Sequence, residues 1–150
     1  MNPVQRFQFR LQRILQWQER VCRLEEDKLR TSLLEIAETE EKLARQAAER
    51  VAVEREFSSQ PALAPPDLQA LAAFRRKTVL DRLALEQERQ NRQTTLDAQR
   101  QKLVAERRRL HIIEKLRERA LQEYTRAADR ELEALSQESY LSTWISRAAR

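Results

Sequence analysis

Glycine is absent from this chain of 150 residues, and cysteine and histidine occur once each, as Cys22 and His111. Phosphate-cradling loops and dinucleotide fingerprints need glycine where the backbone approaches phosphate, and tight hairpin turns need it where φ is positive. One cysteine cannot close an intramolecular disulfide, and one histidine cannot build a His-based metal site or a catalytic triad. These absences exclude a standard nucleotide-binding loop and argue against a β-rich fold.

Aromatic residues make up only 5% of the chain, and no apolar run approaches the roughly 20 residues that span a bilayer. The opening "MNPVQRFQFR" lacks an apolar signal core. What is abundant is charge, at 35%, together with Leu, Ala and Gln, a composition typical of long helices or coiled coils. Carboxylates spread along a rod line no concave site. We therefore expect a cytoplasmic protein that is not an enzyme, binds no cofactor or metal and does not insert into a membrane.

Apolar residues recur every seven positions in two parts of the chain, which is the coiled-coil condition. The first row is Leu15, Cys22, Leu29, Ile36 and Leu43, widened by Leu11, Leu33 and Ala47, with polar companions at Gln18, Glu25 and Thr39. The later rows are Leu96, Leu103 and Leu110, and then Ile113, Ala120, Ala127, Ala134 and Leu141. Each part therefore predicts one long amphipathic helix.

The stretch "SSQPALAPPD", residues 58–67, separates the two helices because its prolines remove amide donors and restrict the residues before them. We expect helix one over about 5–57, a Pro-rich turn over 58–66 and helix two over about 67–145, with Asp67 as its N-cap. The whole chain, 1–150, is predicted to be a single all-α unit. It is a long two-helix antiparallel coiled-coil hairpin with the second helix longer than the first.

A turn centred near residues 62–63 gives the register of this hairpin. It places Leu15 opposite Leu110, Cys22 opposite Leu103, and Leu29 opposite Leu96. The alternative is an open pair of helices, each packing on another chain. In the hairpin, helix one begins opposite about residue 120, so the end of helix two projects with its own apolar stripe. That stripe is Leu121, Tyr124, Ala128, Leu132, Leu135, Leu141 and Trp144.

The formal net charge is +5, and the first 24 residues are locally basic. Such an excess favours an acidic partner surface. The run Arg107–Arg109 has no interleaved aromatic residues and fans across different helix faces, so a solvated surface is favoured over nucleic-acid binding. Trp17 and Trp144 lie off the heptad rows, where they either bind a partner or cover the edge of a stripe.

Two stretches resemble the FliJ family of flagellar export proteins. They are "FQFRLQRILQWQERVCRLEEDKLRTSLLEI", residues 7–36, and "LVAERRRLHIIEKLRERALQEYTRAADRELEALSQESY", residues 103–140. The resemblance implies a cytoplasmic, antiparallel coiled coil, peripheral to the inner membrane, similar to the stalk of rotary ATPases. It implies as partners the hexameric export ATPase, the cytoplasmic domain of the membrane export gate and the export chaperones. Stalk proteins of virulence type III secretion systems look similar and remain an alternative, as does an unrelated coiled-coil tether, with a nucleic-acid-binding rod third.

The resemblance also implies a gate-binding surface at the beginning of helix two, for which the candidates by position are Leu71, Phe74, Arg75 and Val79. Leu71 and Phe74 could equally cover the tip of the hairpin. A stalk that enters a ring needs a slender, charged tip, and the open end of the hairpin fits this better than the uncharged turn. The expected ATPase-binding residues are Arg6, Arg10, Arg13, Trp17, Arg117, Arg119, Tyr124, Arg126 and Arg130.

Overall fold

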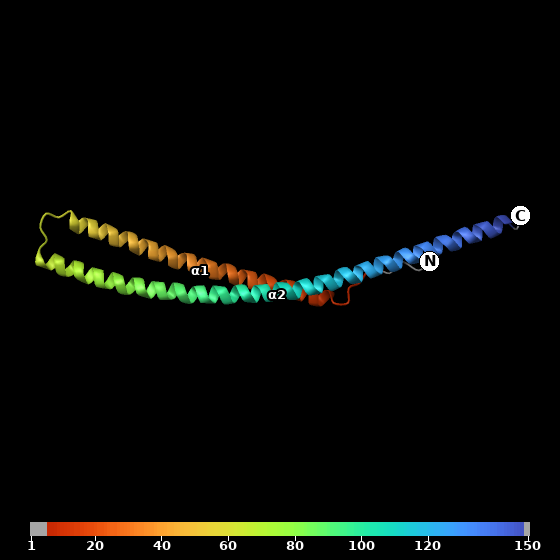
Figure 1. Ribbon diagram of the computed structural model, residues 1–150, viewed down its shortest axis with the longest axis horizontal. Coiled ribbons are helices and arrows are strands. Elements are labelled where there is room, and N and C mark those ends of the chain that lie inside the picture. The colour runs from red at the N-terminus through yellow and green to blue at the C-terminus, as the bar shows by residue number, and fades with distance from the viewer. Residues whose placement is uncertain (1–5, 149–150) are drawn as a thin grey trace. The chain divides into compact units, whose positions relative to one another are not determined.

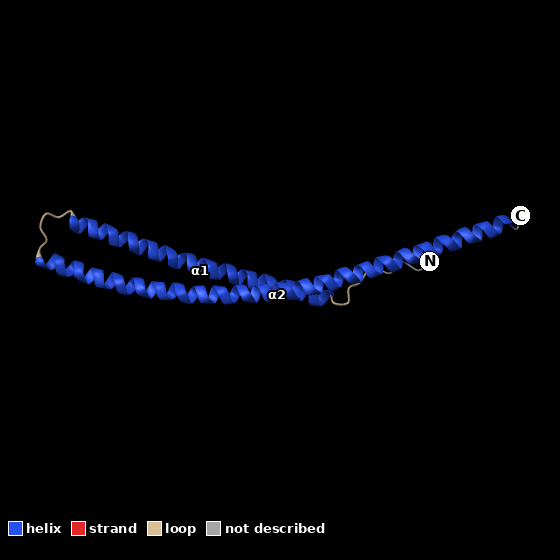
Figure 2. Cartoon of the chain, in the orientation of Figure 1, coloured by secondary structure: helices blue, strands red, loops and turns tan. Residues whose placement is uncertain are grey.

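The structure, a computed structural model, describes residues 6–148, and these form two helices and no strand (Figures 1 and 2). Helix α1 spans Gln12–Ser58 and α2 spans Pro65–Ala148, with 47 and 84 residues. The all-α hairpin with a longer second helix is therefore confirmed. Among the described residues, neither helix holds a stretch long and apolar enough to cross a membrane.

The chain divides into two compact units. The first, here called the terminal unit, comprises residues 1–22 and 105–150, of which 6–22 and 105–148 are described. The second, here called the turn unit, comprises residues 23–104. Both α1 and α2 contribute to each unit.

In the turn unit α1 and α2 run antiparallel (Figure 1), because partner numbers fall along α2 as they rise along α1. Four cross-helix contacts show this: Glu25 with Gln99, Glu35 with Arg92, Gln46 with Thr78, and Glu54 with Arg75. The first two bracket the level of Leu29 and Leu96, so the predicted register of that pair is confirmed. In the terminal unit, Gln18 reaches Glu106, which fits Leu15 at the level of Leu110.

The seam between the helices alternates apolar and polar layers. Leu15, Cys22 and Ile36 are buried as predicted, and so are the polar companions Gln18 and Thr39, the latter completely. A buried polar group must find a partner, and Thr39 Oγ1 donates to the Glu35 carbonyl at 3.0 Å. The prediction that Leu33 and Ala47 widen the stripe is wrong, since Leu33 is 45% exposed and Ala47 is exposed as well.

Two of the polar layers use the same amide–carboxylate contact. The Gln18 side-chain amide donates to the Glu106 carbonyl at 3.2 Å and to its carboxylate at 2.6 Å. In the turn unit, the Gln99 amide donates to the Glu25 carbonyl at 3.2 Å and also to its carboxylate. Lys28 and Gln99 hydrogen-bond the Glu25 carboxylate and lower its pKa. Each amide thus satisfies two acceptors of one residue, which offsets the cost of placing glutamates on the seam.

Helix α2 starts two residues earlier than predicted, and Asp67 is not its N-cap. The Ala64 carbonyl accepts from the amides of Asp67, at 3.0 Å, and Leu68, at 3.2 Å, so Ala64 is the capping residue. Pro65 and Pro66 occupy the first turn, where their missing amides would have no intrahelical acceptor. Asp67 Oδ2 instead accepts the Ala64 amide at 3.3 Å, as the acid of a capping box does.

Helix α1 starts later than predicted, at Gln12 rather than about residue 5. Its first turn is closed by the Gln12 amide, which donates to the Phe9 carbonyl at 3.1 Å, and residues 6–9 have no regular structure. Residue 5 itself lies outside the described residues. The sequence therefore predicted that residues 6–11 lie along α2, but it did not predict that they do so outside a helix.

Candidate binding surface

The segment before α1 lies against α2 in the terminal unit. The rings of Phe7 and Tyr124 meet with centroids 5.5 Å apart and planes tilted by 55°. Phe7 and Phe9 are both half-buried, whereas Gln8 between them is exposed, as expected of an extended segment with one face on a helix. This aromatic contact anchors residues 6–11 and so fixes the position of the arginines next to them.

A pocket of about 510 Å³ lies beside this anchor and gathers arginines from both parts of the terminal unit. Its lining consists of Phe7, Gln8, Phe9, Arg10, Gln12, Arg13 and Arg117. Arg10 lies just before α1, Arg13 lies in its first turn, and Arg117 comes from α2. Arg117 is thus brought next to Arg10 and Arg13, from which it is far apart in the sequence, and all three were predicted for the ATPase-binding end.

The electrostatics of this place favour an anion. The first turn of α1 contains no acidic residue, although the amides at a helix N-terminus carry a partial positive charge that carboxylates usually offset. Arg10 and Arg13 add two full positive charges there instead. Among the described residues, no carboxylate forms an ion pair with Arg10, Arg13 or Arg117. A carboxylate or phosphate from a partner would relieve this local excess of charge.

The remaining predicted residues of this end are accessible, but they do not converge on the pocket. Trp17 is 61% exposed on α1, and Arg6 is exposed before the helix. Along α2, Arg119, Arg126 and Arg130 are all exposed, and Arg130 Nε donates to the Arg126 carbonyl at 3.2 Å. Tyr124 is occupied by its contact with Phe7. Sequence reasoning missed Phe7 and Phe9, whose signal was the i, i+2 aromatic pair in "FQF".

Beyond the anchor, α2 continues as a bare helix. Ala128 is the last half-buried residue, and every residue from 129 to 148 is exposed. We call residues 129–148 the overhang. Its large exposed apolar side chains are Leu132, Leu135, Tyr140, Leu141, Trp144 and Ile145. The predicted projection with its stripe is confirmed for the overhang, whereas Tyr124 and Ala128 lie on the covered part of the helix.

The predicted gate-binding residues at the start of α2 fall into two groups. Leu71 is buried at 8% exposure and Phe74 is half-buried, so both pack within the turn unit, as the alternative interpretation expected. Val79 is 54% exposed. Arg75 forms two hydrogen bonds to the Glu54 carboxylate, at 2.6 and 2.7 Å, which lower the pKa of Glu54. Only Arg75 and Val79 therefore present much surface to a partner.

Comparison with models of known protein families, with curated proteins and with solved structures found no match to this chain. Among the described residues, no group of three or more His, Cys, Asp or Glu side chains could hold a metal ion. His111 lies on the surface, with Nδ1 3.9 Å from Glu114. The chemistry on which a functional proposal can draw is therefore that of exposed arginines, aromatic anchors and an exposed amphipathic helix.

Proposed function

We propose that this chain is a non-enzymatic stalk or adaptor of the flagellar type III protein export apparatus. It binds the hexameric export ATPase through the terminal unit and links the ring to the cytoplasmic domain of the export gate and to export chaperones. It acts in the cytoplasm, peripheral to the inner membrane. The observation that supports this most is the pocket where Arg10, Arg13 and Arg117 meet without carboxylate partners.

The geometry of this pocket suits a charged ring. A hexamer repeats each acidic lining residue six times, so a compact group of arginines meets the same carboxylates in each of six equivalent rotational positions. Exposed charges contribute little one by one, but a matched cluster speeds docking and makes it sensitive to salt. The Phe7–Tyr124 contact holds the arginine-bearing segment on α2 before the partner arrives, which reduces the entropy lost on binding.

The proposed contact with the export gate uses the start of α2. Val79 and Arg75 would contact the gate, while Leu71 and Phe74 pack within the turn unit and support this surface. Phe74→Ala separates the two roles of this region. Loss of gate binding with helicity intact supports a direct contact, whereas loss of helicity assigns Phe74 to packing.

The test of ATPase binding is the triple variant Arg6→Glu, Arg10→Glu, Arg13→Glu, assayed on a purified export ATPase ring at low ionic strength. All three side chains are exposed, so helicity measured by circular dichroism should hardly change while ring binding weakens about tenfold or more. The matched control is Arg23→Glu, Arg30→Glu, Arg45→Glu, which makes the same change in net charge on exposed positions of α1 in the turn unit.

Equal binding by the triple variant and the wild type would exclude the terminal unit as the ATPase contact. Rings from a flagellar and from a virulence secretion system, tested side by side, distinguish the two kinds of stalk. Binding to neither ring, together with duplex DNA binding that falls steeply with salt, would favour the nucleic-acid-binding rod instead. Binding to none of the three would leave an unrelated tether.

A further inference from the structure

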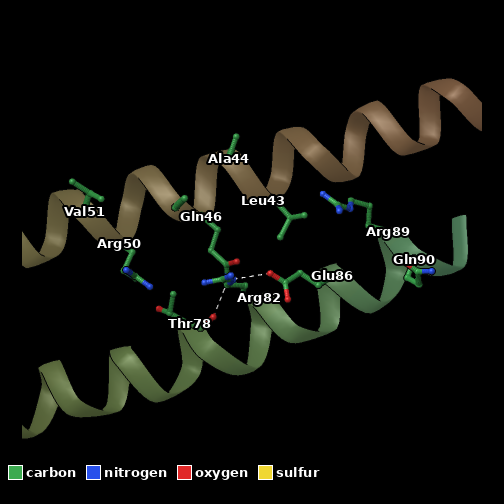
Figure 3. Close-up of a pocket in the computed structure, with 11 residues that line it drawn as sticks. Leu43, Ala44, Gln46, Arg50, Val51, Thr78, Arg82, Glu86, Arg89 and Gln90 are labelled. Carbon is green, nitrogen blue, oxygen red and sulfur yellow. Dashed lines mark hydrogen bonds and ion pairs between the residues drawn. The ribbon is translucent and has the colours of Figure 1, made fainter. Parts of the chain in front are cut away.

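A groove of about 610 Å³ lies between α1 and α2 in the turn unit (Figure 3). Its α1 wall is largely apolar and its α2 wall is polar. The α1 wall consists of Leu43, Ala44, Gln46, Ala47, Arg50 and Val51, and the α2 wall of Thr78, Arg82, Glu86, Arg89 and Gln90. An apolar floor beside charged side chains is the pattern expected of a surface that receives an amphipathic helix.

Positive charge is in excess in this groove. It contains three arginines and one glutamate. Arg82 pairs with Glu86 at 2.8 Å, whereas Arg50 and Arg89 have no carboxylate within ion-pair distance among the described residues. In Figure 3, Arg50 projects from α1 and Arg89 from α2 toward the space between the helices. An occupant with carboxylates would therefore be favoured over a neutral or basic one.

The groove lies where two arginines occupy positions of a heptad row that holds leucine further along α2. Arg89 and Arg82 stand seven and fourteen residues before Leu96, and the row continues through Leu103 and Leu110. Leu96 and Leu103 are buried at 2% and 4% exposure. Arginine carries its guanidinium out to water, so where it replaces leucine the seam stays open.

The same row reappears, exposed, in the overhang. Counting on in sevens from Leu110 leads to Glu131, Glu138 and Ile145, and all three are exposed. Leu141, from the companion row, lies on the same face and is 55% exposed. Glu131 and Glu138 are seven residues apart, as Arg82 and Arg89 are, so both pairs are separated by two helical turns, about 10.5 Å.

We infer that the overhang of one copy of this chain docks in the groove of a second copy. Glu131 and Glu138 meet Arg82 and Arg89, while Leu141 and its neighbours cover the apolar wall around Leu43. The lengths agree, since residues 131–145 and the groove segment 78–90 both span about 20 Å at 1.5 Å per residue. The apolar contact supplies most of the affinity, and the two charge pairs fix which helix enters and in what register.

Four properties favour the overhang over an unrelated protein as the occupant of the groove. The charged pairs of the two surfaces are opposite in sign and equal in spacing, the two segments match in length, and both surfaces expose apolar side chains. The contact is heterologous, because two different surfaces of the same chain meet. Its formation depends on the concentration of the chain alone and needs no ATPase ring. A test on the purified chain is thus independent of the function proposed above.

The test is a charge exchange followed by analytical ultracentrifugation of the full chain at low ionic strength. We expect the wild type to associate with rising concentration. Arg82→Glu with Arg89→Glu, and separately Glu131→Arg with Glu138→Arg, should each weaken this association about tenfold or more. In an equimolar mixture of the two double variants, the groove of each has the charge opposite to that of the other's overhang, so a tagged copy of one should capture the other from solution.

Two controls make the same change in charge at exposed positions off the contacting faces. They are Arg76→Glu with Lys77→Glu, and Asp129→Arg with Glu133→Arg, and both should associate as the wild type does. The first precedes the groove segment, and the second lies two residues on either side of Glu131, on the opposite side of the helix. A wild-type chain that stays monomeric at all accessible concentrations would overturn the inference. So would association that survives both double variants, or reversed variants that fail to capture each other while remaining helical.

Discussion

The two halves of the turn unit differ in how far their shared seam is closed. In the half distant from the turn, residues 23–39 and 85–104 bury side chains of both helices: Ile36, Thr39, Leu96 and Leu103. In the half next to the turn, no residue of α1 from 40 to 58 is buried, and α2 buries only Leu71 and Thr78. The ribbons also lie farther apart toward the turn (Figure 1).

The difference shows that a heptad row closes a seam only where both helices supply apolar side chains. Leu43 belongs to the same row as Ile36, yet Leu43 stays half-exposed, because Arg82 stands near its level on α2. Polar residues alone do not open the seam. Thr39 is completely buried because its hydroxyl donates to the Glu35 carbonyl, whereas a guanidinium has five donors, more than one neighbouring acceptor can satisfy.

The largest effect should come from breaking the closed half. Leu96→Asp places a carboxylate where 2% of the side chain is exposed and no partner waits. We expect a loss of about 3 kcal/mol or more in the free energy of unfolding, measured by urea titration of the helical signal.

The matched control is Leu80→Asp, on the same helix but 67% exposed. It should change the unfolding free energy by less than about 0.5 kcal/mol. Equal effects of the two substitutions would mean that burial at position 96 contributes little to the stability of the hairpin.

A smaller effect, an increase in the free energy of unfolding, should follow from closing the seam in the half next to the turn. Arg82→Leu with Arg89→Leu extends the row of Leu96 and Leu103 and gives Leu43 a covering side chain. Partial burial of the two leucines should stabilise the hairpin by about 1–2 kcal/mol. Thermal unfolding measures this, with the exposed substitution Arg76→Leu as control. A destabilised double variant would show that the arginines hold the helices together rather than apart.

The smallest effect should be the dependence on pH. Hydrogen bonds from Arg75 lower the pKa of Glu54 in the open half, and those from Lys28 and Gln99 lower the pKa of Glu25 in the closed half. A carboxyl whose folded pKa is depressed stabilises the fold above its unfolded value, near 4.5, and loses this stabilisation as the pH falls through the folded value.

The wild type should therefore lose thermal stability between about pH 5 and about pH 3, and Glu54→Gln should lose less over that interval. Exposure of the Glu54–Arg75 pair keeps the difference small. A variant with the same pH profile as the wild type would leave Glu54 without a role in acid sensitivity.

Sequence reasoning reached the fold and the register because both depend on apolar spacing. Leu29 and Leu96 are set opposite each other by counting from the turn, and hydrogen bonds on both sides of them agree. The predicted starts of both helices were wrong because local hydrogen bonds determine where a helix begins. Ala64, which is not a typical capping residue, caps α2 with its backbone, and Pro65 starts the helix although prolines here were interpreted as part of the turn.

The residues that form the candidate surfaces were predicted in part. Exposed arginines near the start of the chain follow from the first heptad row, since Arg10 and Arg13 lie off it. Arg10 and Arg13 lie near Arg117 because the extended segment before α1 is anchored by Phe7. This proximity could not be predicted when residues 6–11 were assumed to be helical. The groove at Arg82 and Arg89 was missed because a row of leucines was followed only as far as it stayed apolar.

The two amide–carboxylate layers also determine which alignments of the helices are excluded. Along α1 the order is Gln18 then Glu25, and along α2 it is Gln99 then Glu106. Sliding the helices by seven residues in one direction brings Glu25 opposite Glu106, two like charges on a seam. Sliding them in the other direction places Glu106 opposite Leu11 and deprives its carboxylate of an amide donor. A slip of seven residues would keep the heptad spacing of the apolar rows, so these two glutamines help to select the single alignment of this glycine-free hairpin.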